Sequence, residues 1–416
     1  MNVAAVIAEY NPFHFGHQFH LQETRKQTHA DALVVVMSGF FTQRGQPAIL
    51  QPWQRAKAAI QHGADLVILL PAISSLQPAD GFAAGGVSMA SQLPGVQFLS
   101  FGAETPCLED LTTVANALLH DSVQVEFAKE EQKAGGNFGR TQANAMGRHP
   151  NLQSLAPILN SPNNILAISY IKAILSQGSS LQPHVVARIG AGYLDEELQP
   201  LASASALRKA LSEGVSLYAH LPAASYAVLE EERAQSRLIT STEQFSAQIL
   251  TLLQRANLDD IAELPEMVEG LENRFMLFRN AATIQEFIRS VKSKRYPYSK
   301  LQRSLFHLLL GIRKSDLPAP QTPMPYALVL AYNATGQKLL SQWRKISGIP
   351  LITRPVRQRA ELTDYGKRLL DIDRLASEVW TLALPAPYRQ PGLWCKQMPI
   401  RISVAMSGET EALPEE

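Results

Sequence analysis

The sequence predicts an α/β protein whose first half contains a parallel, Rossmann-like sheet. Short apolar runs rich in β-branched residues occur at residues 3–8, 32–37, 66–70, 97–101 and 185–188. Each run is closed by Gly, Pro or a polar turn, as buried strands are. Helical patterns lie between them, for example at residues 52–62, where Trp53, Ala56 and Ile60 share one helix face. Strands that alternate with helices pair in parallel and are covered on both faces.

The remainder of the chain has a different character. Residues 105–160 are largely helical in pattern, with a polar, Gly-containing break around 134–140, and indicate an insertion before the sheet resumes. From about residue 210 to 315 the periodicity is helical, and prolines between 318 and 325 then indicate a linker. Strand-like runs return at 326–332 and 348–353. We therefore expect a sheet domain at 1–215, a mostly helical, basic region at 216–317 and a small α/β region at 326–416.

Composition excludes several classes of protein. Of the 416 residues, 46% are hydrophobic, which allows a large core and argues against global disorder. Cys107 and Cys395 have no CxxC partner, which excludes a disulfide scaffold and a cysteine-based zinc site and fits a reducing compartment. The first apolar run is too short for a signal peptide, and no later run reaches the ~18 residues of a membrane span. We expect a cytoplasmic protein without a membrane partner.

The turn after the first apolar run carries the strongest chemical pattern. It reads Glu9-Tyr10-Asn11-Pro12-Phe13-His14-Phe15-Gly16-His17 and leads into a helical pattern. Ligands of open α/β sheets bind beyond the carboxyl ends of strands, and a helix N-terminus offers backbone N–H groups to an anion. Gly16 lets the backbone approach a phosphate, and imidazolium groups at His14 and His17 would stabilise charge on a phosphate under attack. The alternative is that both histidines only cap the helix, but the position of HxGH directly after a strand favours catalysis.

His14-Phe15-Gly16-His17 resembles the HxGH motif of the nucleotidyltransferase superfamily. The longer string from Glu9, with Met37-Ser38-Gly39 and Gln43-Arg44-Gly45, is similar to the bacterial tRNA(Met) cytidine acetate ligase family, most strongly in the N-terminal half. The resemblance implies ATP as a substrate, with Mg²⁺ accompanying the triphosphate although no carboxylate cage is visible, and acetate and elongator tRNA(Met) as partners. It implies nucleotide contacts by Ile7, Ala8, Glu9, Tyr10, Asn11, Pro12, Phe13, His14, Phe15, Gly16, His17, Gln18, Phe19, His20, Gly102, Asn163 and Arg188.

A second group of polar residues follows later strands. Asn163-Asn164 precede a helical run, where they cap the helix or read an adenine edge, and the sequence leaves both open. Arg188 ends a strand, where its guanidinium suits phosphate oxygens, although it could also be a plain surface residue. Gly102 ends another strand, where any tight turn would also favour glycine.

The stretch Ala202-Ser203-Ala204-Ser205-Ala206-Leu207-Arg208 opens a helix. By itself it reads as an ordinary N-capped helix with a solvated arginine. Its position after the last strand resembles the second superfamily motif, ISSTxIR, which implies that Ser205 and Arg208 hold the outer phosphates. Ala202 and Ala204 replace the expected Ile and Ser, so the prediction depends less on Ser203 than on Ser205 and Arg208.

Two further regions are polar or basic. The loop with Ser38-Gly39 and Gln43-Arg44-Gly45 could shape the acid pocket or receive the nucleotide to be modified, and the sequence does not choose. Between residues 274 and 314 the local charge is +9, in a chain whose net charge is +1. The basic residues are Arg274, Arg279, Arg289, Lys292, Lys294, Arg295, Lys300, Arg303, Arg313 and Lys314, interleaved with Phe275, Phe278, Tyr296 and Tyr298. A solvated helix face is one interpretation; the one-signed charge favours RNA binding, with exposed tyrosines stacking on bases.

We therefore expect an ATP-dependent ligase that adenylates acetate and transfers the acetyl group to N4 of the wobble cytidine of elongator tRNA(Met). The acid, the cytidine and the tRNA follow from the resemblance alone. His14, His17, Ser205 and Arg208 are the expected catalytic residues. The alternatives are a small-molecule adenylyltransferase of the phosphopantetheine or NMN type, which would not need the basic region, and a non-catalytic RNA-binding protein. The sequence leaves the oligomeric state open.

Overall fold

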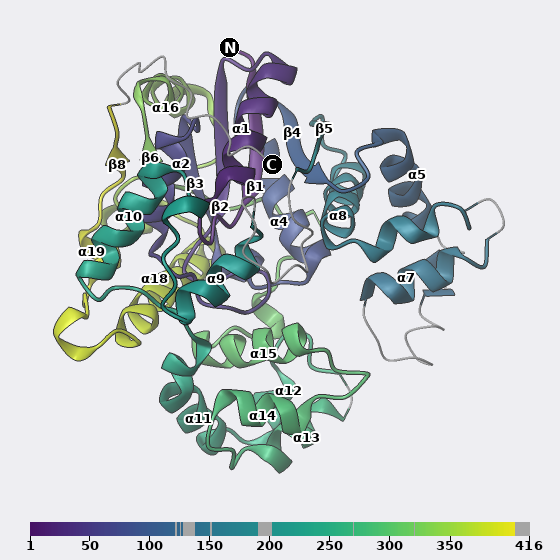
Figure 1. Ribbon diagram of the computed structural model, residues 1–416, viewed down its shortest axis with the longest axis vertical. Helices are drawn as coiled ribbons and strands as arrows, with labels where there is room; N and C mark the ends of the chain where they lie inside the picture. Colours follow the sequence, from purple (N-terminus) through teal and green to yellow (C-terminus); the bar gives the residue numbers. More distant parts are fainter. Residues whose placement is uncertain are drawn as a thin grey trace.

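The computed structural model confirms the α/β fold class. It describes residues 1–120, 123–124, 126–127, 138–149, 152–189, 202–268, 270–319 and 321–403. One sheet organises them, in the strand order β5-β4-β1-β2-β3-β6-β7 with β8 beside β6 (Figure 1). The strands are β1 (Val3–Ala8), β2 (Ala32–Ser38), β3 (Leu66–Leu70), β4 (Val96–Ala103), β5 (Gln182–Ala187), β6 (Ala327–Tyr332), β7 (Leu351–Ile352) and β8 (Ile400–Arg401). The first five run parallel, because helical crossovers connect them.

Each face of the sheet has its own apolar core. Successive side chains of a strand point to opposite faces, so Ala4 and Val6 of β1 join one cluster while Ala5 and Ile7 join the other. Helices α2 (Pro52–Gln61) and α18 (Asp364–Leu382) contribute to the first cluster, and α4 (Ala79–Ser91) and α8 (Pro162–Ser176) contribute to the second. The other helices are α1 (Phe15–Thr28), α3 (Ala72–Ser75), α5 (Leu108–Leu119), α7 (Phe138–Met146), α9 (Ala204–Ser212), α10 (Ala223–Ala234), α11 (Ser246–Arg255), α12 (Leu258–Ala262), α13 (Leu271–Phe278), α14 (Ile284–Val291), α15 (Tyr298–Leu310), α16 (Ala334–Ile346), α17 (Pro355–Gln358) and α19 (Leu393–Lys396).

Helices α11 to α15 form a helical lobe below the sheet in Figure 1. No strand occurs among the described residues of 216–319, as the helical periodicity predicts. Helix α15 of this lobe packs against the loop that follows β2. The ring centroids of Phe306 and Phe41 lie 4.9 Å apart, and a Cβ on Gly45 would lie 2.5 Å from the backbone nitrogen of Arg303. The lobe therefore adjoins the carboxyl edge of the sheet.

The C-terminal region extends the first sheet, which the sequence did not indicate. Strand β6 pairs with β3 in antiparallel orientation, and β7 and β8 pair with β6. Of the predicted helical insertion, the structure describes α5, α7 and a 3₁₀ turn at Ala156–Asn160; residues 134–137 of its predicted break lie outside the described residues. The described helices include none with the length and apolarity that a bilayer crossing requires.

Gly336 allows α16 to lie against the loop that enters β3. A Cβ at this position would overlap the carbonyl oxygen of Asp65 and lie 2.9 Å from its carbonyl carbon. We expect Gly336→Ala to lower the free energy of unfolding by about 1–3 kcal/mol, measured by urea denaturation, because backbone must shift to admit the methyl group. Gly348→Ala is the matched control, since its Cβ would meet no atom within 4 Å. Equal losses in the two variants would contradict this packing.

Candidate functional site

The turn between β1 and α1 places two histidines at the start of a helix. His14 is the N-cap of α1: its Nδ1 accepts a hydrogen bond from the backbone N–H of Gly16 at 3.1 Å. The backbone N–H of His14 in turn donates to Nδ1 of His17 at 3.2 Å, which completes a reciprocal capping box. A Cβ at residue 16 would lie 3.0 Å from Cε1 of His14, so glycine makes room for this ring. The capping interpretation and the catalytic one are therefore compatible.

The same hydrogen bonds determine where each ring carries its proton. A nitrogen that accepts a hydrogen bond holds no proton, so neutral His14 and His17 both carry it on Nε2. Burial lowers the pKa of His14 to about 3, with Arg188 and Arg208 adding to the effect. Burial, His14 and Arg188 lower the pKa of His17 well below its usual value. The resting site therefore presents two neutral N–H donors, a charge state that the HxGH motif does not specify.

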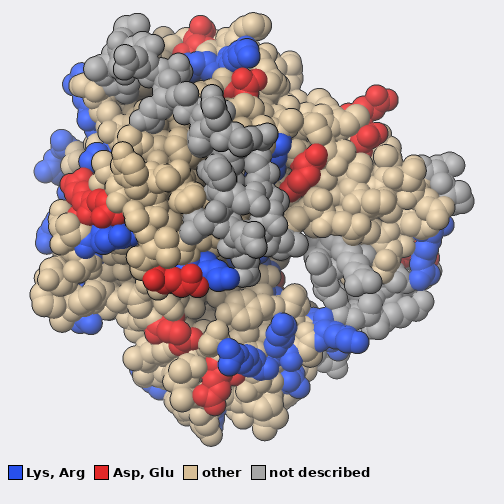
Figure 2. Space-filling model, viewed as in Figure 1, with Lys and Arg blue, Asp and Glu red and all other residues tan. Residues whose placement is uncertain are grey.

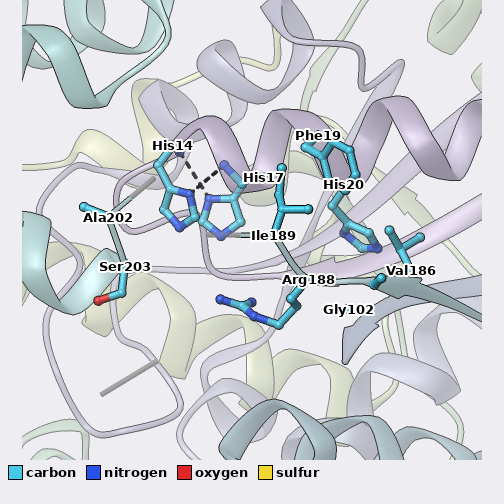
Figure 3. Close-up of a pocket in the computed structure, with 12 residues that line it drawn as sticks. His14, His17, Phe19, His20, Gly102, Val186, Arg188, Ile189, Ala202 and Ser203 are labelled. Atoms are coloured by element: carbon cyan, nitrogen blue, oxygen red, sulfur yellow. Dashed lines mark hydrogen bonds between the residues drawn. The ribbon is translucent and has the colours of Figure 1, made fainter. Parts of the chain in front are cut away.

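A pocket opens directly in front of these rings. It holds about 550 Å³ of space not occupied by atoms, part of it open to solvent. Figure 3 shows the His14 and His17 rings side by side at one end and His20 near Gly102 and Val186 at the other, with Arg188 between. The lining residues are His14, Gly16, His17, Phe19, His20, Gly102, Val186, Ala187, Arg188, Ile189, Ala202 and Ser203. The predicted nucleotide turn, Gly102 and Arg188 thus meet at one edge of the sheet.

Arg188 and Gly102 lie on neighbouring strands. The sequence predicts a strand that ends at Arg188, whereas β5 ends one residue earlier, at Ala187. The backbone N–H of Arg188 donates to the carbonyl oxygen of Ala103 at 3.1 Å. A Cβ on Gly102 would lie 3.2 Å from Cγ of Arg188. Gly102 lies within β4 and pairs with Val186. Its lack of a side chain therefore leaves room for the side chain of Arg188 and does not form a tight turn.

The start of α9 faces the same turn. Ser203 is the N-cap of α9 and lines the pocket. Arg208 donates from Nη1 to the carbonyl oxygen of Asn11 at 2.9 Å and from Nη2 to Oγ of Ser205 at 3.1 Å. Arg208 therefore joins α9 to the nucleotide turn and adds positive charge beside His14. Ser203, on which the sequence prediction depends less, is among the lining residues, whereas Ser205 is not and instead accepts a hydrogen bond from Arg208.

Asn163 has a partner of its own. Its Nδ2 donates to Glu104 at 2.6 Å, and the other carboxylate oxygen of Glu104 accepts from the backbone of Asn164 at 3.0 Å. Asn164 also bonds the backbone and hydroxyl of Thr105. The two amides thus tie the start of α8 to the loop after β4. Asn163 is not part of the pocket lining, and its role in adenine recognition stays a prediction.

Arg55 was missed at the sequence level and is central to the loops at the sheet edge. Its side chain is 1% exposed and donates to four backbone carbonyls: those of Glu9, Ser38, Gly39 and Leu50. Burial lowers its pKa to about 9, a shift that the neighbouring Glu9 opposes. Glu9 also accepts from the backbone of Gln43 at 2.6 Å. The turn before His14 and the loop after β2 are therefore held by one guanidinium and one carboxylate. Only tertiary contacts reveal this role, since Arg55 lies in an ordinary amphipathic helix.

The basic region divides into exposed and buried charges. Figure 2 shows Lys and Arg on the helical lobe, and exposed residues of this region are Arg289, Lys292, Lys294, Arg295, Arg313 and Lys314. Arg303 is buried and pairs with Glu266 through two short hydrogen bonds. Tyr296 is 5% exposed, so its expected stacking on bases is wrong, whereas Tyr298 is 38% exposed. The exposed charges gather after α14, at residues 292–295.

No group of three or more His, Cys, Asp or Glu side chains in the described part of the chain could hold a metal ion. Among the described residues, those that line the pocket include no carboxylate.

The buried histidines predict a marked sensitivity to acid. Burial lowers the pKa of His20, His62 and His307 to about 4, besides those of His14 and His17. Because the unfolded chain takes up these protons near pH 6.5, stability is full above that pH and falls below it, by about 1.4 kcal/mol per pH unit and histidine. Asp373 opposes this trend, since burial raises its pKa to about 7. We expect the free energy of unfolding to fall from pH 6.5 to 5, measured by denaturant titration.

His307→Gln supplies the control for this pH dependence. Nε2 of His307 bonds the carbonyl oxygen of Leu76 at 2.8 Å, and the glutamine amide reaches a similar position without titrating. Below pH 6.5, the free energy of unfolding of this variant should fall less steeply, by about 1.4 kcal/mol per pH unit, which is the contribution of one histidine. An unchanged slope would contradict the assignment.

Comparisons with known proteins agree with this geometry. A family model described as HIGH Nucleotidyl Transferase matches residues 1–392. The tRNA(Met) cytidine acetate ligase of Thermosipho melanesiensis is 36% identical, over 92% of this chain and 95% of that protein, and the enzyme of that name from Bacillus subtilis is 34% identical, over 94% of each.

Two crystal structures of Thermotoga maritima TmcAL are similar throughout. The apo form has a TM-score of 0.91 and 29% identity over 97% of this chain and all of that one. The form bound with alpha-thio ATP has a TM-score of 0.89 and 28% identity over the same shares. With the HxGH turn, the parallel sheet and this similarity along nearly the whole chain, the protein belongs to the HIGH nucleotidyl transferases, and among them to the tRNA(Met) cytidine acetate ligase family.

Proposed function

We propose that the protein adenylates acetate with ATP and transfers the acetyl group to N4 of the wobble cytidine of elongator tRNA(Met). The observation that carries this proposal is the pair of Nε2–H donors on His14 and His17, held at the N-terminus of α1 beside Arg188 and Arg208. A triphosphate suits this donor set, which combines a helix N-terminus, two arginines and two N–H groups. The relatives' names supply acetate, cytidine and tRNA(Met).

In the first step, an acetate oxygen attacks the α-phosphorus of ATP and the bond to pyrophosphate breaks. The N–H groups of His14 and His17 donate to oxygens on the transferring and leaving phosphates, where negative charge grows. These donors are already oriented by the capping box, so little reorganisation is needed. Arg188 and Arg208 hold the outer phosphates. Mg²⁺ would accompany the triphosphate, because phosphate oxygens are among its usual ligands.

In the second step, the cytidine amine attacks the acetyl carbon, AMP leaves, and the amine releases a proton. We propose that the helical lobe, within the predicted region 216–317, binds the tRNA. Its exposed charges at residues 292–295 meet the phosphate backbone, and the half-exposed Tyr298 lies at the start of α15. Gln43 links this lobe to the active site, because its carbonyl accepts from Arg303 at 3.2 Å and its N–H donates to Glu9. Of the two roles that the sequence leaves open for this loop, shaping the acid pocket and receiving the nucleotide, we propose the second on the basis of this link.

The test is transfer of labelled acetate, with ATP and Mg²⁺, with and without total bacterial tRNA. We expect pyrophosphate release and label in tRNA, and weaker tRNA binding when Lys292, Lys294 and Arg295 are replaced together by Gln. A stable dinucleotide formed without RNA would instead indicate a small-molecule adenylyltransferase. Salt-sensitive tRNA binding without any pyrophosphate would indicate a non-catalytic RNA-binding protein.

A further inference from the structure

A buried hydroxyl lies directly behind the pocket. Ser100 of β4 is 0% exposed, and its Oγ lies 3.0 Å from Nε2 of His20, 2.7 Å from Oγ1 of Thr24 and 3.2 Å from Nδ1 of His184. His20 and Thr24 belong to α1 and His184 to β5, so one serine joins three elements that surround the pocket.

These three contacts use the full hydrogen-bonding capacity of a serine. A hydroxyl donates once and accepts twice, and Ser100 has three polar neighbours. Because the strand is rigid and the hydroxyl is buried, the His20 ring is held in one orientation. Among the described residues Nδ1 of His20 has no hydrogen-bond partner, which leaves that nitrogen for a ligand.

The position of His20 in the pocket indicates which part of a ligand it meets. Figure 3 shows it near Gly102 and Val186, at the end away from Ser203 and the His14–His17 pair. A nucleoside triphosphate whose phosphates lie against the two N–H donors extends its nucleoside towards His20. The ribose hydroxyls and the base edge both offer partners to an imidazole nitrogen.

We propose that Ser100 is a positioning residue that holds His20 against the nucleoside of ATP, and so sets the affinity for ATP more than the rate of adenylation. This inference rests on the proposed function. It extends the site to a residue that never touches the ligand. Because the interaction is made equally in the ground and transition states, its loss should raise KM and leave kcat nearly unchanged.

The experiment measures the Kd of ATP by titration calorimetry without acetate, in the full-length protein. We expect Ser100→Ala to raise the Kd about tenfold, as the loss of one orienting hydrogen bond does. His20→Ala should raise it similarly, and the double variant should bind no more weakly than His20→Ala alone. Ser377→Ala is the control for burial, since that serine is 0% exposed and its Oγ has no partner in the structure; it should bind ATP like the parent protein.

Each outcome decides one question. An unchanged Kd in Ser100→Ala overturns the proposal. So does a tenfold weakening that persists in the His20→Ala background, because Ser100 would then act through general structure and not through His20. A loss of kcat with unchanged KM likewise contradicts an affinity role. If the parent protein itself fails to bind ATP, the proposed function is wrong, which is a different result.

Discussion

Replacing His17 by Asn is expected to slow pyrophosphate formation by about 10²–10³-fold, the usual effect of removing one donor to a developing phosphate or oxyanion charge. The asparagine Oδ1 reaches the place of Nδ1 and still accepts from the backbone N–H of His14, so the capping box survives. What the variant loses is the Nε2–H that faces the pocket. The measurement is the rate of pyrophosphate release at saturating ATP and acetate.

His17→Gln is the matched partner of that variant. Its amide nitrogen lies near the place of Nε2, but it offers no acceptor at Nδ1. If His17 acts as a donor, Gln retains more activity than Asn. If His17 only caps the helix, the order reverses, because Asn preserves the cap and Gln does not. Near-normal activity in His17→Asn would therefore refute the catalytic role.

Arg55→Met is expected to lower the free energy of unfolding by about 3–5 kcal/mol. The methionine fills a similar volume but leaves four backbone carbonyls, those of Glu9, Ser38, Gly39 and Leu50, without their donor. The loops before His14 and after β2 should loosen together, so ATP affinity should fall with stability. Urea denaturation and ATP titration on the same samples measure both effects.

The control for Arg55→Met is Arg344→Met, which removes an exposed arginine from α16. Exposed substitutions of this kind change stability by less than about 0.5 kcal/mol. A loss below about 1 kcal/mol in Arg55→Met would mean that the loops hold together without the guanidinium.

The sequence predicts those features that depend on neighbours in the chain. Apolar runs bounded by turns locate β1 to β4 within two residues, and HxGH locates the turn that leads into α1, because both patterns are local. The pairing of β6 with β3 depends on contacts between distant segments, so the sequence gives no sign that the C-terminal region completes the sheet. The positions of Arg55 and Ser100 are not predictable for the same reason.

Charge patterns mislead where a partner lies outside the pattern. Arg303 belongs to the basic run in the sequence, yet Glu266, which precedes that run, neutralises it in a buried pair. Tyr296 lies among lysines and arginines but packs into the core of the lobe. The ring nitrogen that carries the proton in neutral His14 and His17 depends on hydrogen bonds to Nδ1, which no motif specifies.

The most direct test of adenylation follows the oxygen atoms of acetate. If acetate attacks the α-phosphorus and the acetyl group then passes to a cytidine amine, one acetate oxygen remains on AMP. With ¹⁸O-labelled acetate, ATP and tRNA(Met), we predict AMP that carries one ¹⁸O in its phosphate, measured by mass spectrometry, in amounts equal to the N4-acetylcytidine formed. Unlabelled AMP, or ADP with the label in inorganic or acetyl phosphate, would contradict attack at the α-phosphorus.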